Sequence, residues 1–329
     1  QVLYNHKSGK QLTATIYNSY IDKSLLNDLI KKSPPADPKT AILKHSIPET
    51  VTFDSKKDCH RFCWQKSLGL KSWIWKITQS SGGKGIFPIQ NETSCHQQCQ
   101  WNEAGSIQAQ YKLKPLLDAK GRKFDVRVYM LVANVDPLIV FKGPDWVKMC
   151  FEPYHSKNPV PYPRLDPTGT LNPFQNLCNY DIAEVHPNFN TNLTLSMKTD
   201  ELQLLQPNMQ NELLGKFDAP TLAVAELLKH RWQGRVGMFH MFALDYLVDE
   251  NAKPYLLEVN KQPGIGAVYP KVWPTVWVDM LKTVWEVFNG LNHNVNMTEL
   301  RERLEAMQDE NTFQILKVGE EEGVATEQS

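Results

Sequence analysis

Two carboxylates and one amide in the last third of the chain are spaced so that a hairpin would bring them onto one face. Apolar-rich runs at residues 239–248 and 254–260 flank a short polar stretch, and this pattern predicts two antiparallel strands joined by a turn. Antiparallel partners share a face and side chains alternate along a strand, so Asp245, Glu258 and Asn260 are expected to point the same way. The hairpin would therefore collect three oxygen-bearing side chains in an otherwise apolar setting.

This predicted face has the composition of a magnesium site. If Asp249 pairs with Pro254 across the turn, Asp245 lies directly opposite Glu258, and two facing carboxylates repel unless a cation lies between them. Mg²⁺ is commonly held by one or two carboxylates together with the phosphates of a nucleotide. The alternative is a half-buried hairpin with a polar face and no ligand. The hairpin alone does not separate the two.

A second charged face is predicted on the strand at residues 123–130. Lys123, Asp125 and Arg127 alternate with apolar residues, so all three point to one side. Three charges on one face of an apolar strand are costly to bury without partners. One interpretation is a nucleotide site, with the cations on phosphates and the acid on ribose hydroxyls or a neighbouring amine. The alternative is a solvated face whose charges pair with one another.

A glycine-rich loop that contains a lysine separates two short predicted strands earlier in the chain. The strands are residues 72–77, with Lys76 near the end, and residues 86–89; the loop, residues 80–85, contains Lys84. Glycines let backbone N–H groups approach a polyphosphate and the lysine supplies charge, so the loop is a candidate flap over phosphates. An ordinary hairpin tip is the alternative, and no Walker A motif occurs in the sequence.

Four of the six cysteines lie in a repeated sequence motif. The C-H-x-x-C pattern of Cys59 and Cys63 recurs at Cys95 and Cys99, and a spacing of four residues places each pair on one side of a helix. The four thiols can form two disulfides, or bind zinc with the adjacent histidines in reserve. They can also pack as reduced apolar side chains between helices, which is the favoured interpretation.

Composition is that of an ordinary globular protein. Of the 329 residues, 41% are hydrophobic and 22% are charged, and 36 Lys and Arg balance 36 Asp and Glu. This balance gives no sign of a nucleic acid or membrane surface as a partner, and no apolar run reaches membrane-spanning length. Three glycosylation sequons, at Asn91, Asn192 and Asn296, hint at a secretory route, although their number is near what chance gives.

Hydrophobic periodicity predicts the elements that position these residues. Segments 221–231 and 273–291 are expected to be amphipathic helices, and the aromatic stripe of the second, which includes Trp277 and Trp285, is interpreted as core. Residues 153–173 are proline-rich and expected to be irregular. Further helices are predicted at residues 23–30, 54–68 and 93–101, and a last helix is predicted to end near residue 308. Further strands are predicted at residues 106–111 and 138–141, and the tail from residue 318 is expected to be disordered.

In order along the chain, these pieces resemble the motifs of the tubulin–tyrosine ligase-like family, a branch of the ATP-grasp ligases. The resemblance covers roughly residues 40–290. The matching segments are Trp73-Ile74-Trp75-Lys76, Gly83-Lys84-Gly85-Ile86, Tyr111 with Pro115-Leu116-Leu117, Arg122-Lys123-Phe124-Asp125-Val126-Arg127, Glu152-Pro153-Tyr154, Asn176, Asp245-Tyr246-Leu247-Val248-Asp249 and Leu257-Glu258-Val259-Asn260.

The resemblance implies an α+β (mixed α/β) ATP-grasp fold. Residues 1–50 would form a small N-terminal piece, residues 51–115 a central flap domain, and residues 116–294 a C-terminal domain whose antiparallel sheet carries the metal hairpin. Residues 295–329 would add a helix and a disordered acidic tail.

The resemblance also implies an enzyme, an ATP-dependent ligase that adds a free amino acid to a protein or peptide carboxylate, such as a tubulin tail, through an acylphosphate. Its cofactors would be ATP and Mg²⁺. The implied metal ligands are Asp245, Glu258 and Asn260; the implied cofactor-binding residues are Lys76, Lys84, Gln110, Tyr111, Lys123, Asp125 and Asn176; and the implied catalytic residues are Arg127 and Lys148.

Two departures from the family pattern keep alternatives open. Lys148 stands where the family usually carries an arginine, and the His-x-Thr that usually precedes Asn176 is missing. The chain could thus be a catalytically degenerate nucleotide-binding interaction module, or a secreted ligase for a non-tubulin acceptor. A monomer without nucleic acid or membrane span is expected. The resemblance implies a cytoplasmic localisation, at the cytoskeleton or cilium. The cysteine repeat and the sequons favour the alternative, a secretory or luminal localisation.

Overall fold

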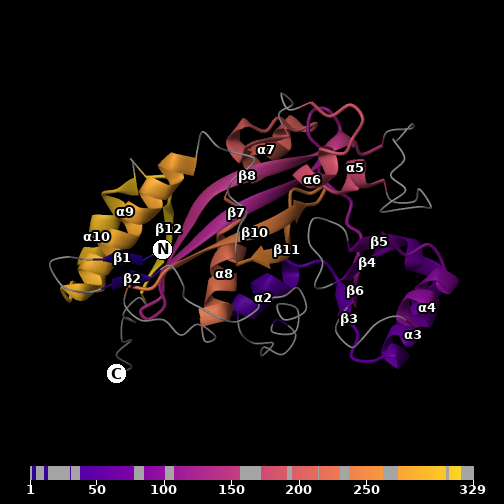
Figure 1. Ribbon diagram of the computed structural model, residues 1–329, viewed down its shortest axis with the longest axis horizontal. Coiled ribbons are helices and arrows are strands. Elements are labelled where there is room, and N and C mark those ends of the chain that lie inside the picture. Colours follow the sequence, from indigo (N-terminus) through magenta and orange to yellow (C-terminus); the bar gives the residue numbers. More distant parts are fainter. Residues whose placement is uncertain are drawn as a thin grey trace, which may run out of the picture.

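The computed structural model describes most of the chain and mixes helices with antiparallel strands, which confirms the α+β class (Figure 1). Among the described residues, no helix combines the length and apolar character needed to cross a bilayer. The described residues are 2–4, 11–13, 30, 38–77, 85–100, 107–155, 172–190, 195–213, 215–229, 237–261, 273–308 and 311–319.

The larger sheet has six strands and is built around β7 (Arg122–Asn134). All of its pairings are antiparallel, so each strand continues the face of its neighbours. The other strands are β8 (Ile139–Pro153), β9 (Ser196–Lys198), β10 (His240–Val248), β11 (Pro254–Asn260) and β12 (Gln314–Val318), in the order β11-β10-β7-β8-β12 with β9 also paired to β8.

One face of β7 is the apolar face that the sequence predicted. Phe124, Val126 and Val128 are fully buried there. They share one hydrophobic core with residues of helices α2 (Pro38–His45) and α8 (Asp218–Leu228), which pack on each other and cover this side of the sheet (Figure 1). Burial of these side chains is the main force that holds the helices on the strands.

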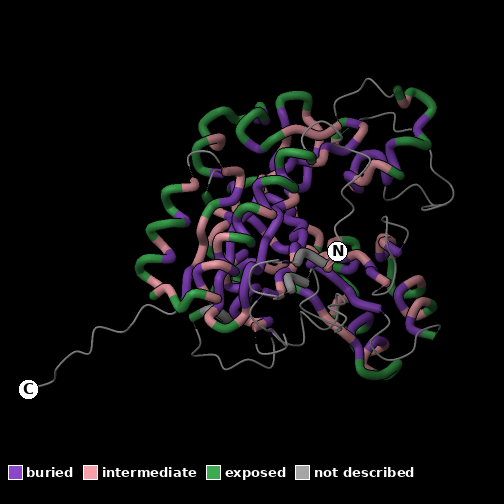
Figure 2. Tube along the Cα trace, turned by 60° about the vertical axis from the view of Figure 1, so that its left-hand side comes forward, coloured by how far each residue is buried: buried purple, intermediate pink, exposed green. Residues whose placement is uncertain are grey.

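The opposite face of the sheet is divided along its length. Helices α9 (Trp273–Asn292) and α10 (Met297–Glu305) share a second core with Tyr129 and Leu131, in the later part of β7. The earlier part of the same face carries the charged residues of β7. Figure 2 shows buried positions concentrated in the strands and exposed ones on the outer sides of the helices. The charged side chains therefore lie beside a well-packed core.

The smaller sheet has four strands in the order β3-β6-β4-β5, all antiparallel. Helices α3 (Lys56–Gln65) and α4 (Glu92–Gln100) pack on the face that carries Trp73 and Trp75. The side chain of Ser55 begins α3 by accepting a hydrogen bond from the Asp58 N–H (3.2 Å). The strands are β3 (Thr50–Thr52), β4 (Trp73–Ile77), β5 (Ile86–Pro88) and β6 (Ile107–Tyr111).

The interpretation of the cysteine repeat as reduced side chains is wrong. Disulfides join Cys59 to Cys99 and Cys63 to Cys95, with Cα separations of 5.6 and 5.7 Å, within the usual range for disulfides. The repeat places two sulfurs on each facing helix, so α3 and α4 are joined twice. A third disulfide, between Cys150 and Cys178, was not predicted because these residues belong to no repeat.

Some predicted elements differ from the structure. The helix predicted at 54–68 ends at Gln65 and continues as a 3-10 helix, Ser67–Ser72. The aromatic stripe of α9 is only partly core, because Trp277 and Trp285 are 37% and 38% exposed. Strand β12 was not predicted. The remaining elements are β1 (Val2–Tyr4), β2 (Gln11–Thr13), α5 (Pro173–Asn176), α6 (Tyr180–Ala183), α7 (Gln210–Leu213) and two 3-10 helices, Thr199–Glu201 and Pro207–Met209.

A cluster of charges around the buried Lys142 lies on the α8 side of the sheet. The Lys142 Nζ is 2.7 Å from Asp218 Oδ1 and 3.6 Å from Asp145 Oδ2. Burial raises the pKa of the Asp145 carboxyl to about 6; Lys142 opposes this shift, and the neighbouring carboxylates of Asp218 and Asp200 add to it. The folded state therefore binds this proton more tightly than the unfolded chain does.

The raised pKa of Asp145 makes its contribution to the free energy of unfolding decrease as the pH rises. The contribution of Asp145 is most favourable below about pH 4 and is lost as the pH rises towards 6. We expect Asp145→Asn to increase the free energy of unfolding at pH 7.5 by up to about 3 kcal/mol, because it removes a buried charge while Asp218 still pairs with Lys142. The gain should shrink below pH 5, as measured by urea unfolding. Asp181→Asn, at an exposed position, should show neither effect; a variant less stable than the parent at pH 7.5 would contradict the prediction.

Candidate active site

The hairpin of β10 and β11 pairs Asp245 with Glu258, as predicted, but through a different turn. Val248, rather than Asp249, pairs with Pro254. A bulge beside Asp245 then shifts the register by one residue, so that Asp245 still lies opposite Glu258. The expected pairing is thus correct although the turn assumed for it is wrong.

The side chain of Asp249 explains the difference. Its Oδ1 accepts hydrogen bonds from the backbone N–H groups of Asn251 and Lys253, both at 2.9 Å. Side-chain bonds of this kind hold a residue in a turn, so Asp249 closes the turn and leaves the ladder to begin at Val248.

The three predicted metal ligands converge. The Asn260 Nδ2 lies 3.2 Å from Glu258 Oε1 and 3.4 Å from Asp245 Oδ2. Two carboxylates and an amide are hard oxygen donors of the kind that Mg²⁺ prefers, and rotation of the amide would turn its oxygen towards them. The donor set therefore fits Mg²⁺.

Asp245 is also the partner of both predicted catalytic cations. Arg127 binds it with two hydrogen bonds, from Nε to Oδ1 and from Nη2 to Oδ2, each 2.7 Å long. The Lys148 Nζ is 3.0 Å from the same Oδ2. Asp245 is only 4% exposed, and such a charge is tolerated because it is paired twice.

These contacts determine the ionisation of the group. Burial acts to raise the pKa of Asp245, but Lys148 and Arg127 outweigh it and hold that pKa well below its usual range. Burial likewise acts to lower the pKa of Arg127, and Asp245 and Glu258 keep it above its ordinary value. Both Arg127 and Asp245 are therefore charged at neutral pH.

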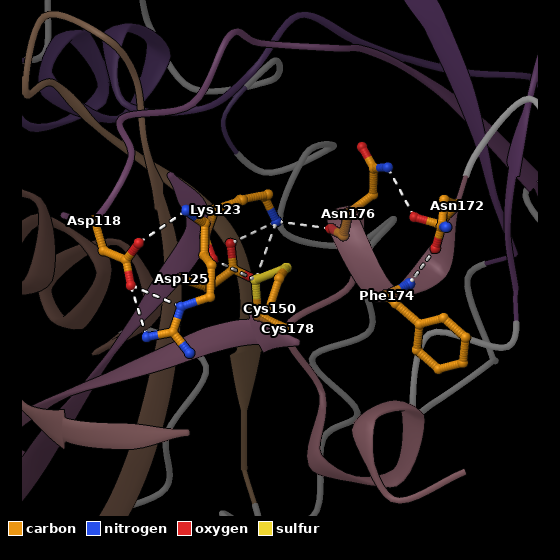
Figure 3. The surroundings of a disulfide bond; sticks show 9 residues. Asp118, Lys123, Asp125, Cys150, Asn172, Phe174, Asn176 and Cys178 are labelled. Atoms are coloured by element: carbon orange, nitrogen blue, oxygen red, sulfur yellow. Dashed lines mark hydrogen bonds and ion pairs between the residues drawn. A yellow bond between two sulfur atoms is a disulfide. The ribbon is translucent and has the colours of Figure 1, made fainter. Parts of the chain in front are cut away.

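A second group is centred on Lys123, which lies next to the third disulfide (Figure 3). The Lys123 Nζ donates to Asp125 Oδ1 and to the backbone oxygen of Asn176, both at 2.9 Å, and lies 3.8 Å from Cys178 Sγ. Cys178 is bonded to Cys150 of β8, so the disulfide holds the segment that begins after α5 against the sheet beneath Lys123.

Asn176 contributes to this group through its backbone. Its side-chain Nδ2 donates to the Asn172 carbonyl at 2.8 Å, while Asn172 Oδ1 caps α5 by accepting from the Phe174 N–H at 2.8 Å (Figure 3). The side chain of Asn176 thus closes the turn of α5 and its carbonyl oxygen holds Lys123.

The two groups form one charged face. Asp125 and Lys148 are direct partners across β7 and β8, and Arg127 and Asp245 are direct partners across β7 and β10. Partners of this kind share a face of the sheet. We call this surface the charged face; its members are Lys123, Asp125, Arg127, Lys148, Asp245, Glu258 and Asn260.

The remaining predicted residues belong to the smaller sheet or to undescribed parts of the chain. Lys76 is buried in β4, opposite Gln108 of β6. The Gln110 side chain donates to Thr50 Oγ1 at 3.0 Å, and the Tyr111 N–H donates to the Glu49 carbonyl at 2.8 Å, so this donor of the predicted adenine hinge is already used. Lys84 and most of the predicted flap loop lie outside the described residues.

One buried contact close to this site was not predicted from the sequence. The Glu152 Oε1 is 3.1 Å from His186 Nε2, and Glu152 Oε2 accepts from Asn172 Nδ2 at 3.4 Å. His186 packs on the rings of Phe151 and Phe174, with centroids 4.1 and 4.5 Å away. Glu152 lies in a recognisable motif, but His186 is 34 residues away and nothing in the sequence connects them.

Comparison with known proteins gives the family of this chain. The model of the tubulin-tyrosine ligase family matches residues 7–294. The chain is 25% identical over 339 residues to the protein polyglycylase TTLL10 of Mus musculus, covering 91% of this chain and 46% of the relative. It is 24% identical over 262 residues to the tubulin polyglutamylase TTLL5 of Homo sapiens, covering 73% and 19%. It is 25% identical over 274 residues to the inactive polyglycylase TTLL10 of Homo sapiens, covering 75% and 39%.

The chain spans about half the length, or less, of these relatives. The family match nevertheless covers most of this chain and includes the charged face. The expected resemblance is thereby confirmed, and the chain belongs to the tubulin-tyrosine ligase family, with its α+β ATP-grasp-like fold.

Proposed function

We propose that this chain is an ATP-dependent carboxylate–amine ligase that adds a free amino acid to a protein or peptide acceptor. The observation that carries the proposal is the convergence of Asp245, Glu258 and Asn260 beside Arg127 and Lys148. Family membership supports it, as do relatives whose names describe glycylation and glutamylation, the latter of tubulin. An acidic peptide such as a tubulin tail is the first acceptor to test.

The proposed reaction has two displacements. A carboxylate oxygen attacks the γ-phosphorus of ATP and ADP leaves, giving an acylphosphate. The amine nitrogen then attacks the acyl carbon, the C–O bond to phosphate breaks, and the nitrogen loses a proton as the amide forms. Mg²⁺ held by Asp245, Glu258 and Asn260 would neutralise charge on the polyphosphate.

The charged face would supply the protein's part of this chemistry. Arg127 and Lys148 are cations already held in place on adjacent strands, where a phosphoryl group with growing negative charge would compete with Asp245 for them. Lys123 would contact phosphate, with Lys76 and Lys84 from the smaller sheet and its loop. Asp125 would accept from ribose hydroxyls or an amine. The adenine hinge at Gln110 and Tyr111 would use groups other than the Tyr111 N–H.

The other candidate is a nucleotide-binding interaction module without turnover. One relative is named an inactive polyglycylase, and this chain has Lys148 and Gln175 where its family motif favours other residues. The two functions differ in whether ADP is formed. Wild-type chain that binds ATP but forms no ADP with any amino acid and acceptor peptide would favour the module.

The proposed metal site predicts the effect of a neutral isostere. Glu258→Gln keeps the side-chain volume and removes only charge, so ADP formation should fall at least about 100-fold while the thermal unfolding midpoint changes little. The matched control is Glu250→Gln in the turn of the same hairpin, whose exposed carboxylate pairs with Lys114. It should keep parental turnover. Equal turnover in the Glu258 variant and the parent would remove Glu258 from the site.

The two-point contact of Arg127 predicts a graded series. Arg127→Ala should lower kcat by about two to three orders of magnitude, because a preorganised cationic donor is worth roughly 3–4 kcal/mol in a transition state. Arg127→Lys keeps the charge and loses the two-point contact of the guanidinium, so its kcat should lie between those of the parent and of Arg127→Ala. ATP affinity should change much less. Urea unfolding of each variant shows whether the weaker pairing of Asp245 lowers the stability of the fold. A large loss of ATP affinity with unchanged kcat would contradict the role assigned to Arg127.

The disulfide beneath Lys123 predicts a selective effect on nucleotide binding. Replacing both Cys150 and Cys178 with Ala should release the segment that holds Lys123 and raise the Kd for ATP about tenfold, which corresponds to about 1.4 kcal/mol. The control replaces Cys63 and Cys95, which removes a disulfide of the α3–α4 pair. Similar losses of affinity in both double variants would mean that the effect is one of general stability. Isothermal titration calorimetry measures the Kd for ATP of both double variants.

A further inference from the structure

All six cysteines of the chain are oxidised. Two disulfides join α3 to α4, and the third joins β8 to the segment after α5. Disulfides persist in oxidising compartments and are rare in the cytosol. A zinc site does not explain the pattern: the described cysteines with metal-like spacing, Cys59, Cys63 and Cys99, all lie in the α3–α4 pair, and Cys150–Cys178 stands apart from them.

The first accessible sequon begins α4. Asn91 and Thr93 are both exposed, and the Asn91 Oδ1 accepts a hydrogen bond from the Ser94 N–H at 2.8 Å. The Asn91 Nδ2 donates to no residue that the structure describes. The amide oxygen thus caps the helix, while the amide nitrogen, the atom to which an N-linked glycan is attached, makes no hydrogen bond to the described residues.

The second accessible sequon begins α10 in the same way. Asn296 is its N-cap, and Asn296 Oδ1 accepts from the Glu299 N–H at 2.8 Å. Asn296 and Thr298 are exposed, and within the described part of the chain the Asn296 Nδ2 has no acceptor. The sequon at Asn192 lies outside the described residues.

We propose that Asn91 and Asn296 carry N-linked glycans, attached in the oxidising secretory compartment where the three disulfides form. In this transfer the amide nitrogen forms a bond to C1 of a lipid-pyrophosphate-linked oligosaccharide, the lipid pyrophosphate leaves, and the nitrogen loses one proton. The amide carbonyl is unchanged, so both helix caps survive the modification.

The positions of the two sites are compatible with the charged face. Helices α4 and α10 lie at opposite ends of the molecule, with β7, β10 and β11 between them (Figure 1). Glycans at both ends would leave the charged face accessible. If the chain is the ligase proposed above, the acceptor it meets in that compartment is a secreted or luminal protein, for which a tubulin-tail peptide serves only as an acidic test substrate. The modification itself does not depend on that activity.

The decisive measurement uses the chain from the cells that make it, with thiols alkylated before lysis. Peptide mapping after enzymatic glycan release in ¹⁸O water should find Asn91 and Asn296 converted to labelled Asp, and all six cysteines protected from alkylation. Unmodified Asn at both positions, or six alkylated cysteines, would overturn the proposal. Since the readout is mass, a failed ligase assay does not affect it.

Matched variants assign the sites when the chain is passed through a eukaryotic secretory pathway. Thr93→Ala and Thr298→Ala each destroy a sequon and keep the capping asparagine, so each should remove the mass of one glycan. Thr93→Ser and Thr298→Ser keep the sequons and should keep the glycans. A parental chain that is secreted with the mass of the bare polypeptide would overturn the assignment.

Discussion

The structure depends on keeping one buried carboxylate ionised. Asp245 lies in the middle of the larger sheet, and its charge is stable there only because Arg127 and Lys148 reach it from β7 and β8. Removing either cation would leave a desolvated charge with half its compensation. The three strands must therefore keep their register to within one residue, and the apolar contacts on both faces of the sheet provide the energy that enforces it.

Two hydrophobic cores together fix the positions of the charged side chains of β7. Beneath the charged face, Phe124, Val126 and Val128 are anchored in the layer formed with α2 and α8. Farther along the same strand, Tyr129 and Leu131 are covered by α9 and α10. Because β7 takes part in both cores, its charged side chains have little freedom to shift, and the flanking disulfide constrains a segment that reaches Lys123 from outside the sheet.

The parts of this arrangement that follow from local pattern could be predicted from sequence. Period-two alternation placed Lys123, Asp125 and Arg127 on one face, and hairpin pairing brought Asp245 to Glu258. Contacts between distant segments could not be read this way. Nothing local indicates that Cys150 meets Cys178, that His186 meets Glu152, or that the Tyr111 N–H is used by Glu49. Strand β12 was not predicted for the same reason, since a five-residue segment of mixed polarity becomes a strand only through its partner β8.

Two of the outer strands of the larger sheet, β11 and β12, share a feature with a consequence for self-association. A regular outer strand offers unpaired N–H and C=O groups to a second chain. Here both β11 and β12 have a register shift, β11 begins with Pro254, and the Leu256 N–H donates to the Ser46 carbonyl. Bulges, proline and a covering segment are devices that oppose strand addition. These two edges are thereby protected against lateral growth, and copies of this chain at high local concentration are not expected to join through them.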